Sequence, residues 1–273
     1  MKRFTLHFTA LAVLAMSSLL PLGQHANANL VVTPFQVIFE GDERFKEVVI
    51  VNTGNETRSY EMEWSFLNMT ETTGKYAKSE DAGEGFDLSK HVIFSPRRVT
   101  LTPGAKQKVR LRVSRPDDLP NRDHHVHLRF SAVSKASQEK ITFDRKNPQI
   151  DVDVSVSYAI PVVLRAGDLP MGANIGDIRI TRNENSGALN AVVPLSHEKG
   201  GAAILSHMYI YHVDGNGKEE LVGEVSNANV FPEIEVKEYK VQLNKKITGG
   251  NLKIVLKKYD RSSVLVERIF PLQ

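Results

Sequence analysis

Short runs of β-branched, aromatic and aliphatic residues, separated by turn-forming residues, constrain the fold of this chain more than any other feature. Within Tyr60–Leu67, the apolar Tyr60 and Met62 alternate with glutamates, a period of two that is typical of a strand with one buried face. No segment shows the 3.6-residue period of an amphipathic helix. An all-β fold is therefore expected. The strands predicted in the first part of the chain include Leu30–Glu40, Phe45–Asn52, Tyr60–Leu67, Lys108–Val113, Val126–Val133 and Ile150–Leu164.

Residues 166–172, which contain two glycines and a proline, interrupt this pattern, and a second series of predicted strands follows. We expect two immunoglobulin-like β-sandwich domains in tandem, with a cleft between them. The boundaries predicted are 29–165 for the first domain, 166–172 for a linker and 173–273 for the second. Residues 68–91 are polar and without period, and are expected to form a long exposed loop. The strands predicted in the second domain are Ile178–Arg182, Leu189–Pro194, Ala203–His212, Leu221–Val225, Lys237–Leu243, Leu252–Tyr259 and Val264–Pro271.

The first 28 residues have the layout of a secretory signal peptide. Lys2 and Arg3 precede an apolar run over Leu11–Leu20, which is too short to span a bilayer. Ala26-Asn27-Ala28 supplies the small residues after which a signal peptidase cuts. We expect export to the periplasm, cleavage after Ala28, and no membrane insertion, because no later segment is apolar over a sufficient length.

The composition and motifs argue against several classes of function. The chain has no cysteine, which removes thiol catalysis and thiolate metal sites, and its net charge of +3 gives no support for nucleic-acid binding. It lacks a Gly-x-Ser-x-Gly elbow, a phosphate-binding glycine loop and a His-Glu-x-x-His pair. An enzyme is therefore not expected, and neither is a cofactor.

One histidine cluster, His124, His125 and His127, has the character of a metal site. On a strand, His125 and His127 would point to the same face and could hold zinc if a third ligand came from elsewhere. The alternative is a solvated or interface face of one strand. We favour this alternative, and predict no metal, because the sequence offers no closed set of ligands.

Motifs from nearly the whole chain resemble, in order and spacing, those of the periplasmic pilus-assembly chaperones of the chaperone–usher pathway, the PapD-like family. The second half matches mainly at Asn229-Val230-Phe231-Pro232-Glu233. In the first half the motifs are Val37-Ile38-Phe39, Val51-Asn52-Thr53-Gly54, Tyr60 with Trp64, Phe94-Ser95-Pro96-Arg97-Arg98, Leu101-Thr102-Pro103-Gly104, Val109-Arg110-Leu111, Asp118-Leu119-Pro120, His127-Leu128-Arg129-Phe130 and Ile160-Pro161-Val162-Val163-Leu164-Arg165.

This resemblance implies a chaperone that binds pilus subunits and delivers them to an outer-membrane usher. Such chaperones insert a strand of their own into the open groove of an incomplete subunit, the mode known as donor-strand complementation. The expected donor residues alternate with polar ones and are Ile150, Val152, Val154 and Val156. The alternative is that this apolar row faces only the core of its own domain.

The resemblance also implies two basic residues that grip the carboxylate at the end of the subunit. The alignment puts Gln36 and Pro161 at those two positions, and neither is charged. Arg129 and Arg165 are the substitutes that we expect, and the alternative for each is an interdomain or surface ion pair.

Two other functions stay open from the sequence. A pilus subunit or adhesin would carry an alternating donor extension at its mature N-terminus, whereas both domains of this chain have a full set of predicted strands. A secreted ligand-binding module, for example for glycans, would typically expose aromatic residues. The single tryptophan, Trp64, falls instead in the buried series of a predicted strand.

Overall fold

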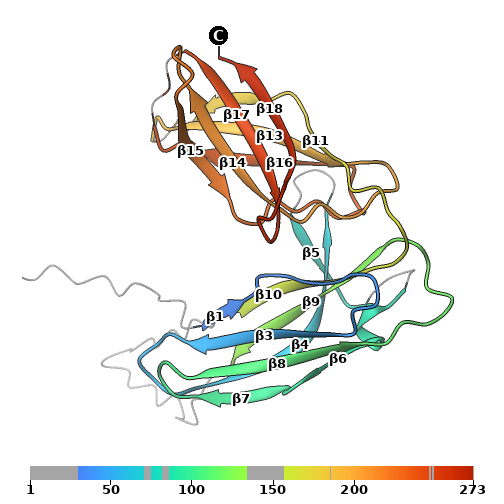
Figure 1. The fold of residues 1–273 in the computed structure, drawn as a ribbon. Coiled ribbons are helices and arrows are strands. Elements are labelled where there is room, and N and C mark those ends of the chain that lie inside the picture. Colours follow the sequence, from blue (N-terminus) through green and yellow to red (C-terminus); the bar gives the residue numbers. More distant parts are fainter. Residues whose placement is uncertain are drawn as a thin grey trace, which may run out of the picture.

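The computed structural model describes residues 30–70, 75–81, 86–133, 157–184, 186–245, 247 and 249–272, and in these the chain forms two β-sandwiches (Figure 1). The strands of the first sandwich are β1 (Leu30–Thr33), β2 (Val37–Phe39), β3 (Phe45–Asn52), β4 (Arg58–Met69), β5 (Tyr76–Ser79), β6 (Val92–Ser95), β7 (Arg98–Leu101), β8 (Lys106–Val113), β9 (Asp123–Ala132) and β10 (Ser157–Arg165), with a 3₁₀ turn at Leu88–Lys90. Those of the second are β11 (Ala173–Ile175), β12 (Arg179–Arg182), β13 (Leu189–His197), β14 (Ser206–Val213), β15 (Glu219–Val225), β16 (Val236–Gln242), β17 (Asn251–Lys258) and β18 (Val264–Pro271).

The first sandwich consists of a sheet in the order β1-β3-β8-β6 and a sheet in the order β2-β10-β9-β4, with β5 and β7 both paired to β4. Strand β8 shows why these residues form a sandwich. Val109, Leu111 and Val113 point inward and are buried, whereas the residues between them are charged and exposed. This alternation buries one face of the strand and leaves the other free.

The second sandwich pairs a sheet in the order β11-β13-β12, to which β16 adds on β13, with a sheet in the order β15-β14-β17-β18. Its core contains Met208, Ile210 and Ile254, all fully buried. The expected fold class, two immunoglobulin-like sandwiches in tandem, is confirmed. No helix in the described part of the chain is long and apolar enough to cross a bilayer.

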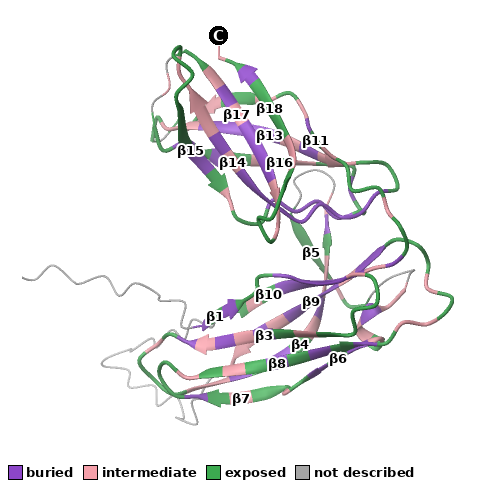
Figure 2. Cartoon of the chain, in the orientation of Figure 1, coloured by how far each residue is buried: buried purple, intermediate pink, exposed green. Residues whose placement is uncertain are grey.

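The two sandwiches pack directly against each other. Ile38 on β2, Met69 on β4 and Val163 on β10 belong to the first sandwich, yet all three are buried in the hydrophobic cluster of the second. Figure 2 shows buried segments on the elements that face each other across this junction. The outward face of the sheet β2-β10-β9-β4 is therefore covered near the junction and not solvated.

Two sequence expectations about local structure are wrong. Residues 68–91 are not only a loop, because β4 runs on to Met69 and pairs with β5, and a 3₁₀ turn follows. The expected strand Leu30–Glu40 is two strands, β1 and β2, which belong to opposite sheets. Pro34 lies between them and has no N–H to donate to a sheet, so the ladder cannot continue through it. The expected signal peptide lies outside the described residues.

Candidate functional site: the open edge of β10 and the domain junction

Strand β10 has one edge that is only partly occupied. On one side it pairs antiparallel with β9 along its whole length, from Ser157 to Arg165. On the other side it pairs with β2, in parallel, only over Val162–Leu164. Among the described residues, the segment Ser157–Pro161 therefore has no partner strand on its outer edge. Pro161 suits such an edge because it has no N–H group to offer to a neighbouring strand.

From Ser157 to Ile160 the side chains of this open edge alternate between the core and the solvent, and Pro161 is buried. Ile160 is buried, and Tyr158 packs against the hydrophobic core of the first sandwich, while Ser157 and Ala159 are exposed. In the sequence, the expected donor residues share the even-numbered positions of Tyr158 and Ile160. These donor residues, Ile150, Val152, Val154 and Val156, lie outside the described residues.

The first expected carboxylate anchor, Arg129, lies beside the open edge. It is on β9, directly opposite Ala159 of β10 and Glu63 of β4. Its guanidinium forms an ion pair with the Glu63 carboxylate, and about a third of its side chain remains exposed (35%). An exposed pair of this kind contributes little to stability, so Arg129 could exchange Glu63 for another carboxylate at small cost.

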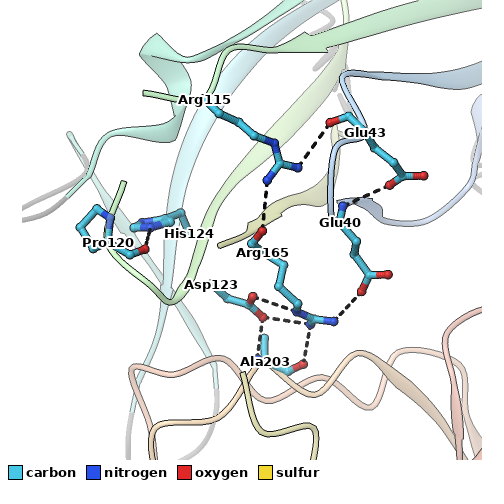
Figure 3. Close-up of polar contacts among 8 residues, drawn as sticks. All are labelled: Glu40, Glu43, Arg115, Pro120, Asp123, His124, Arg165 and Ala203. Carbon is cyan, nitrogen blue, oxygen red and sulfur yellow. Dashed lines mark hydrogen bonds and ion pairs between the residues drawn. The ribbon is translucent and has the colours of Figure 1, made fainter. Parts of the chain in front are cut away.

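The second expected anchor, Arg165, lies at the domain junction in a closed network (Figure 3). Its Nε and one terminal nitrogen donate to both oxygens of Asp123, each at 3.0 Å, and its other terminal nitrogen donates to Glu40 at 2.5 Å. It also donates to the backbone oxygen of Ala203 in the second sandwich, at 3.4 Å. Burial acts to lower the pKa of Arg165, but the hydrogen bond and charge of Asp123 outweigh it and raise that pKa. Arg165 therefore stays charged.

Asp123 connects the two sandwiches, which the sequence analysis did not foresee. Its side chain is fully buried, and one of its carboxylate oxygens accepts both from Arg165 and from the backbone N–H of Ala203, at 2.7 Å. A carboxylate that accepts from a guanidinium and from a backbone N–H of the other domain fixes the position of that domain. This role of Asp123 could have been suspected only from the Asp-Leu-Pro motif that precedes it and from its place at the start of β9.

The two positions at which the resemblance expects basic residues also belong to the junction. Gln36 is buried, and its side-chain oxygen accepts from the Asn229 amide of the second sandwich, at 3.3 Å. Pro161 lies opposite His127 on β9. Asn229 belongs to the one motif of the second half that carried the resemblance.

Two of the three histidines of β9, His125 and His127, lie in the interface between the sandwiches, which agrees with the interface face expected for this strand. His125 stacks on Phe231, with ring centroids 4.2 Å apart, and its Nε2 lies 2.6 Å from a carboxylate oxygen of Glu233. His127 is buried, and the Tyr76 ring of β5 packs edge-on against it at 5.2 Å. His124 points elsewhere and contacts the backbone oxygen of Pro120. In the described part of the chain, no three His, Asp or Glu side chains are grouped so that they could hold a metal ion.

Between the sandwiches lies a pocket of about 60 Å³. Glu40 and Arg165 line it from the first sandwich, and Ala203, Lys258 and Tyr259 line it from the second. By this measure one water needs roughly 10–15 Å³, so the pocket has room for a small polar group such as a carboxylate.

No protein-family model matches the sequence, and no curated protein is found as a relative of it. Solved structures do match its fold. They include the class 5 fimbriae chaperone CfaA (16% identity, 90% of this chain and 99% of that chain, TM-score 0.41) and the CupB2 chaperone of Pseudomonas aeruginosa (12%, 89% and 100%, 0.44). A third is the CsuC–CsuE chaperone–tip adhesion subunit complex of Acinetobacter baumannii (14%, 89% and 98%, 0.44). Each of these neighbours is or contains a chaperone, for class 5 fimbriae in the first case and for Csu pili in the third. At such identities and TM-scores the likeness does not carry their function over to this chain.

Proposed function

We propose that this protein is a periplasmic chaperone that caps pilus subunits by donor-strand complementation and delivers them to an outer-membrane usher. The observation that carries the proposal is the open edge of β10 at Ser157–Pro161. A strand edge with free N–H and C=O groups can pair with the strand of another chain, and unprotected edges are otherwise rare in soluble proteins. The apolar row Ile150–Val156 lies directly before this edge in the sequence.

The proposed mechanism needs only burial and hydrogen bonding. An incomplete subunit would pair with the edge that β10 begins, and Ile150, Val152, Val154 and Val156 would fill its groove. Each such side chain contributes roughly 1.5–3 kcal/mol when it is fully buried. The sandwich pair supports this role, because Asp123 and Arg165 hold the second domain in place without using the open edge. No cofactor or nucleotide takes part.

We propose Arg129 and Arg165 as the groups that bind the carboxylate of the subunit. Their surroundings favour Arg129, since it lies at the open edge and its pair with Glu63 is partly exposed. Arg165 lines the junction pocket, but it would have to give up buried bonds to Asp123 and Glu40.

The deciding experiment replaces Val154 with Asp and measures both thermal melting and capture of a pilus subunit in a pull-down. The charge would have to be buried without a partner in the client's groove, which costs several kcal/mol. We therefore expect lost capture with unchanged melting. In the same pull-down, Arg129→Ala is expected to weaken capture and leave melting unchanged.

The matched control is Ser155→Asp, which adds the same charge one position along, where the neighbouring odd-numbered positions already hold Asp151 and Asp153. It should capture the subunit as the unmodified protein does. If Val154→Asp instead collapses the melting transition, the row is part of the chaperone's own core. If Val154→Asp melts and captures normally, donation by this row is wrong.

A further inference from the structure

The outward side of the sheet β1-β3-β8-β6 carries a row of cations. Lys106, Lys108, Arg110 and Arg112 occupy alternate positions of β8, and all four are exposed, while Val109 and Leu111 between them are buried. Side chains at alternate positions of a strand point to the same face, about 6.8 Å apart. These four residues therefore form a straight basic row down the middle of the sheet, since β8 lies between β3 and β6.

Little negative charge opposes this row. Glu47 of β3 is the only acidic residue in the four strands. It is shared between two of the cations, with its carboxylate oxygens 2.8 Å from Lys108 Nζ and 3.1 Å from Arg110 Nε. Lys106 and Arg112 form no ion pair with any described residue. The face thus keeps a clear excess of positive charge, although the whole chain carries only +3.

Exposed apolar side chains flank the row. Phe45 of β3 and Ile93 of β6 are the cross-strand neighbours of Arg112, and they are 69% and 55% exposed. At the opposite end, Val31 of β1 is exposed next to Val51, whose other neighbour is Lys106. We call this surface the cationic face and define it by Phe45, Ile93 and the four cations of β8.

We propose that the cationic face binds the surface of an anionic lipid bilayer. This face lies in the middle of a sheet and carries long, hydrated cationic side chains, which match a layer of anionic head groups. The flanking Phe45 and Ile93 can insert at the boundary between head groups and acyl chains. An acidic protein would have to desolvate four cations and supply a carboxylate for each, a costly match. The face lies on the side of the first sandwich away from the domain junction, so this contact would leave the junction undisturbed (Figure 1).

The test uses the chain from Asn29 onward, the form expected after export, and its sedimentation with two kinds of vesicle. One kind is phosphatidylcholine alone, and the other contains about 30 mol% phosphatidylglycerol. We expect binding only to the anionic vesicles, and release at roughly 1 M salt, where the screening length falls to about 3 Å. The double variant Lys106→Gln/Arg112→Gln should bind about 25-fold more weakly, since each basic residue near such a surface contributes about fivefold. Phe45→Ser should bind roughly tenfold more weakly.

The matched control is Lys218→Gln/Lys240→Gln, which removes the same charge from exposed positions of the second sandwich. It should bind as the unmodified chain does. Equal weakening by both double variants would mean that net charge, and not this face, drives binding, and the proposal would be wrong. It would also be wrong if the unmodified chain ignores the anionic vesicles but binds polyglutamate through the same face, because the partner is then an acidic protein. Subunit capture is measured separately through Val154→Asp, so either proposal can fail alone.

Discussion

The two sheets of the first sandwich present outward faces that differ in what covers them. On the sheet with β9, the outward residues His125, His127 and Val163 lie under the second sandwich. On the other sheet, the outward residues of β8 face solvent and are all basic. Both faces follow the same alternation in sequence, so the period of two alone does not distinguish them.

This difference shows that a charged side chain plays a different role on each face: on one it must be paired, and on the other it stays in water. At the covered face, Asp123 is fully buried and Arg165 mostly so, and both must be paired, because an unpaired buried charge is strongly destabilising. At the cationic face, Lys106 and Arg112 are hydrated and need no partner. Mutations at the junction should therefore change stability, whereas mutations on the cationic face should change binding.

The largest effect is expected from Asp123→Ala. It removes the two-oxygen partner of the Arg165 guanidinium, which then keeps only the carboxylate of Glu40, and the acceptor of the Ala203 N–H, so the free energy of unfolding should fall by about 3 kcal/mol. Denaturant unfolding would measure the change. Glu61→Ala, which breaks the exposed ion pair of Glu61 with Arg98, is the matched control and should have almost no effect. An equally small effect at Asp123 would show that the junction does not depend on this pair.

A medium effect is expected from the pH dependence of His127. Burial, helped by the nearby His125, lowers the pKa of His127 to about 3, against an ordinary value of 6.5. Between pH 6.5 and pH 3, His127 is therefore protonated in the unfolded chain but not in the folded chain. Stability should fall in this window as the pH falls, by at most about 1.4 kcal/mol per pH unit. His127→Gln should show a smaller slope.

Two neighbouring groups bear on that measurement. Burial also lowers the pKa of His124, so His124 adds a slope of the same sign, and the variant should keep part of the dependence. Burial acts to raise the pKa of Glu233, but the hydrogen bond to His125 outweighs it and leaves that pKa below its ordinary 4.5. Glu233 thus contributes only below pH 4.5, and the comparison is cleanest between pH 6.5 and 4.5. An unchanged slope in the variant would show that His127 is not the group that titrates.

The smallest effect on stability is expected from Glu47→Gln. It removes the carboxylate between Lys108 and Arg110 on a fully solvated surface, so the melting temperature should not change measurably. The same variant removes the only opposing charge of the cationic face. Its affinity for anionic vesicles should therefore rise about fivefold. Unchanged or weaker vesicle binding would contradict the role of the cationic face.

The sequence predicted strand boundaries well where a strand buries one face and exposes the other. The expected strands Phe45–Asn52 and Val264–Pro271 agree with β3 and β18 to the residue. It failed for β5, whose residues Tyr76–Ser79 carry no period because the hairpin projects from the sandwich and is held by pairing with β4. Tyr76 reaches the second sandwich, where its ring lies near Phe231. Such a contact depends on the placement of a whole domain.

The sequence by itself determined that this chain is all-β, in two sandwiches. The reason is that apolar alternation and turn residues are properties of short segments and do not depend on distant parts of the chain. Only the tertiary structure decided which outward residues are covered, and that Arg165 is committed to Asp123 and Glu40. It also decided that β10 pairs with β2 over three residues and, among the described residues, has no outer partner before them. These features join residues that are more than 40 positions apart. Their energies depend on burial and on partners, which the order of residues does not contain.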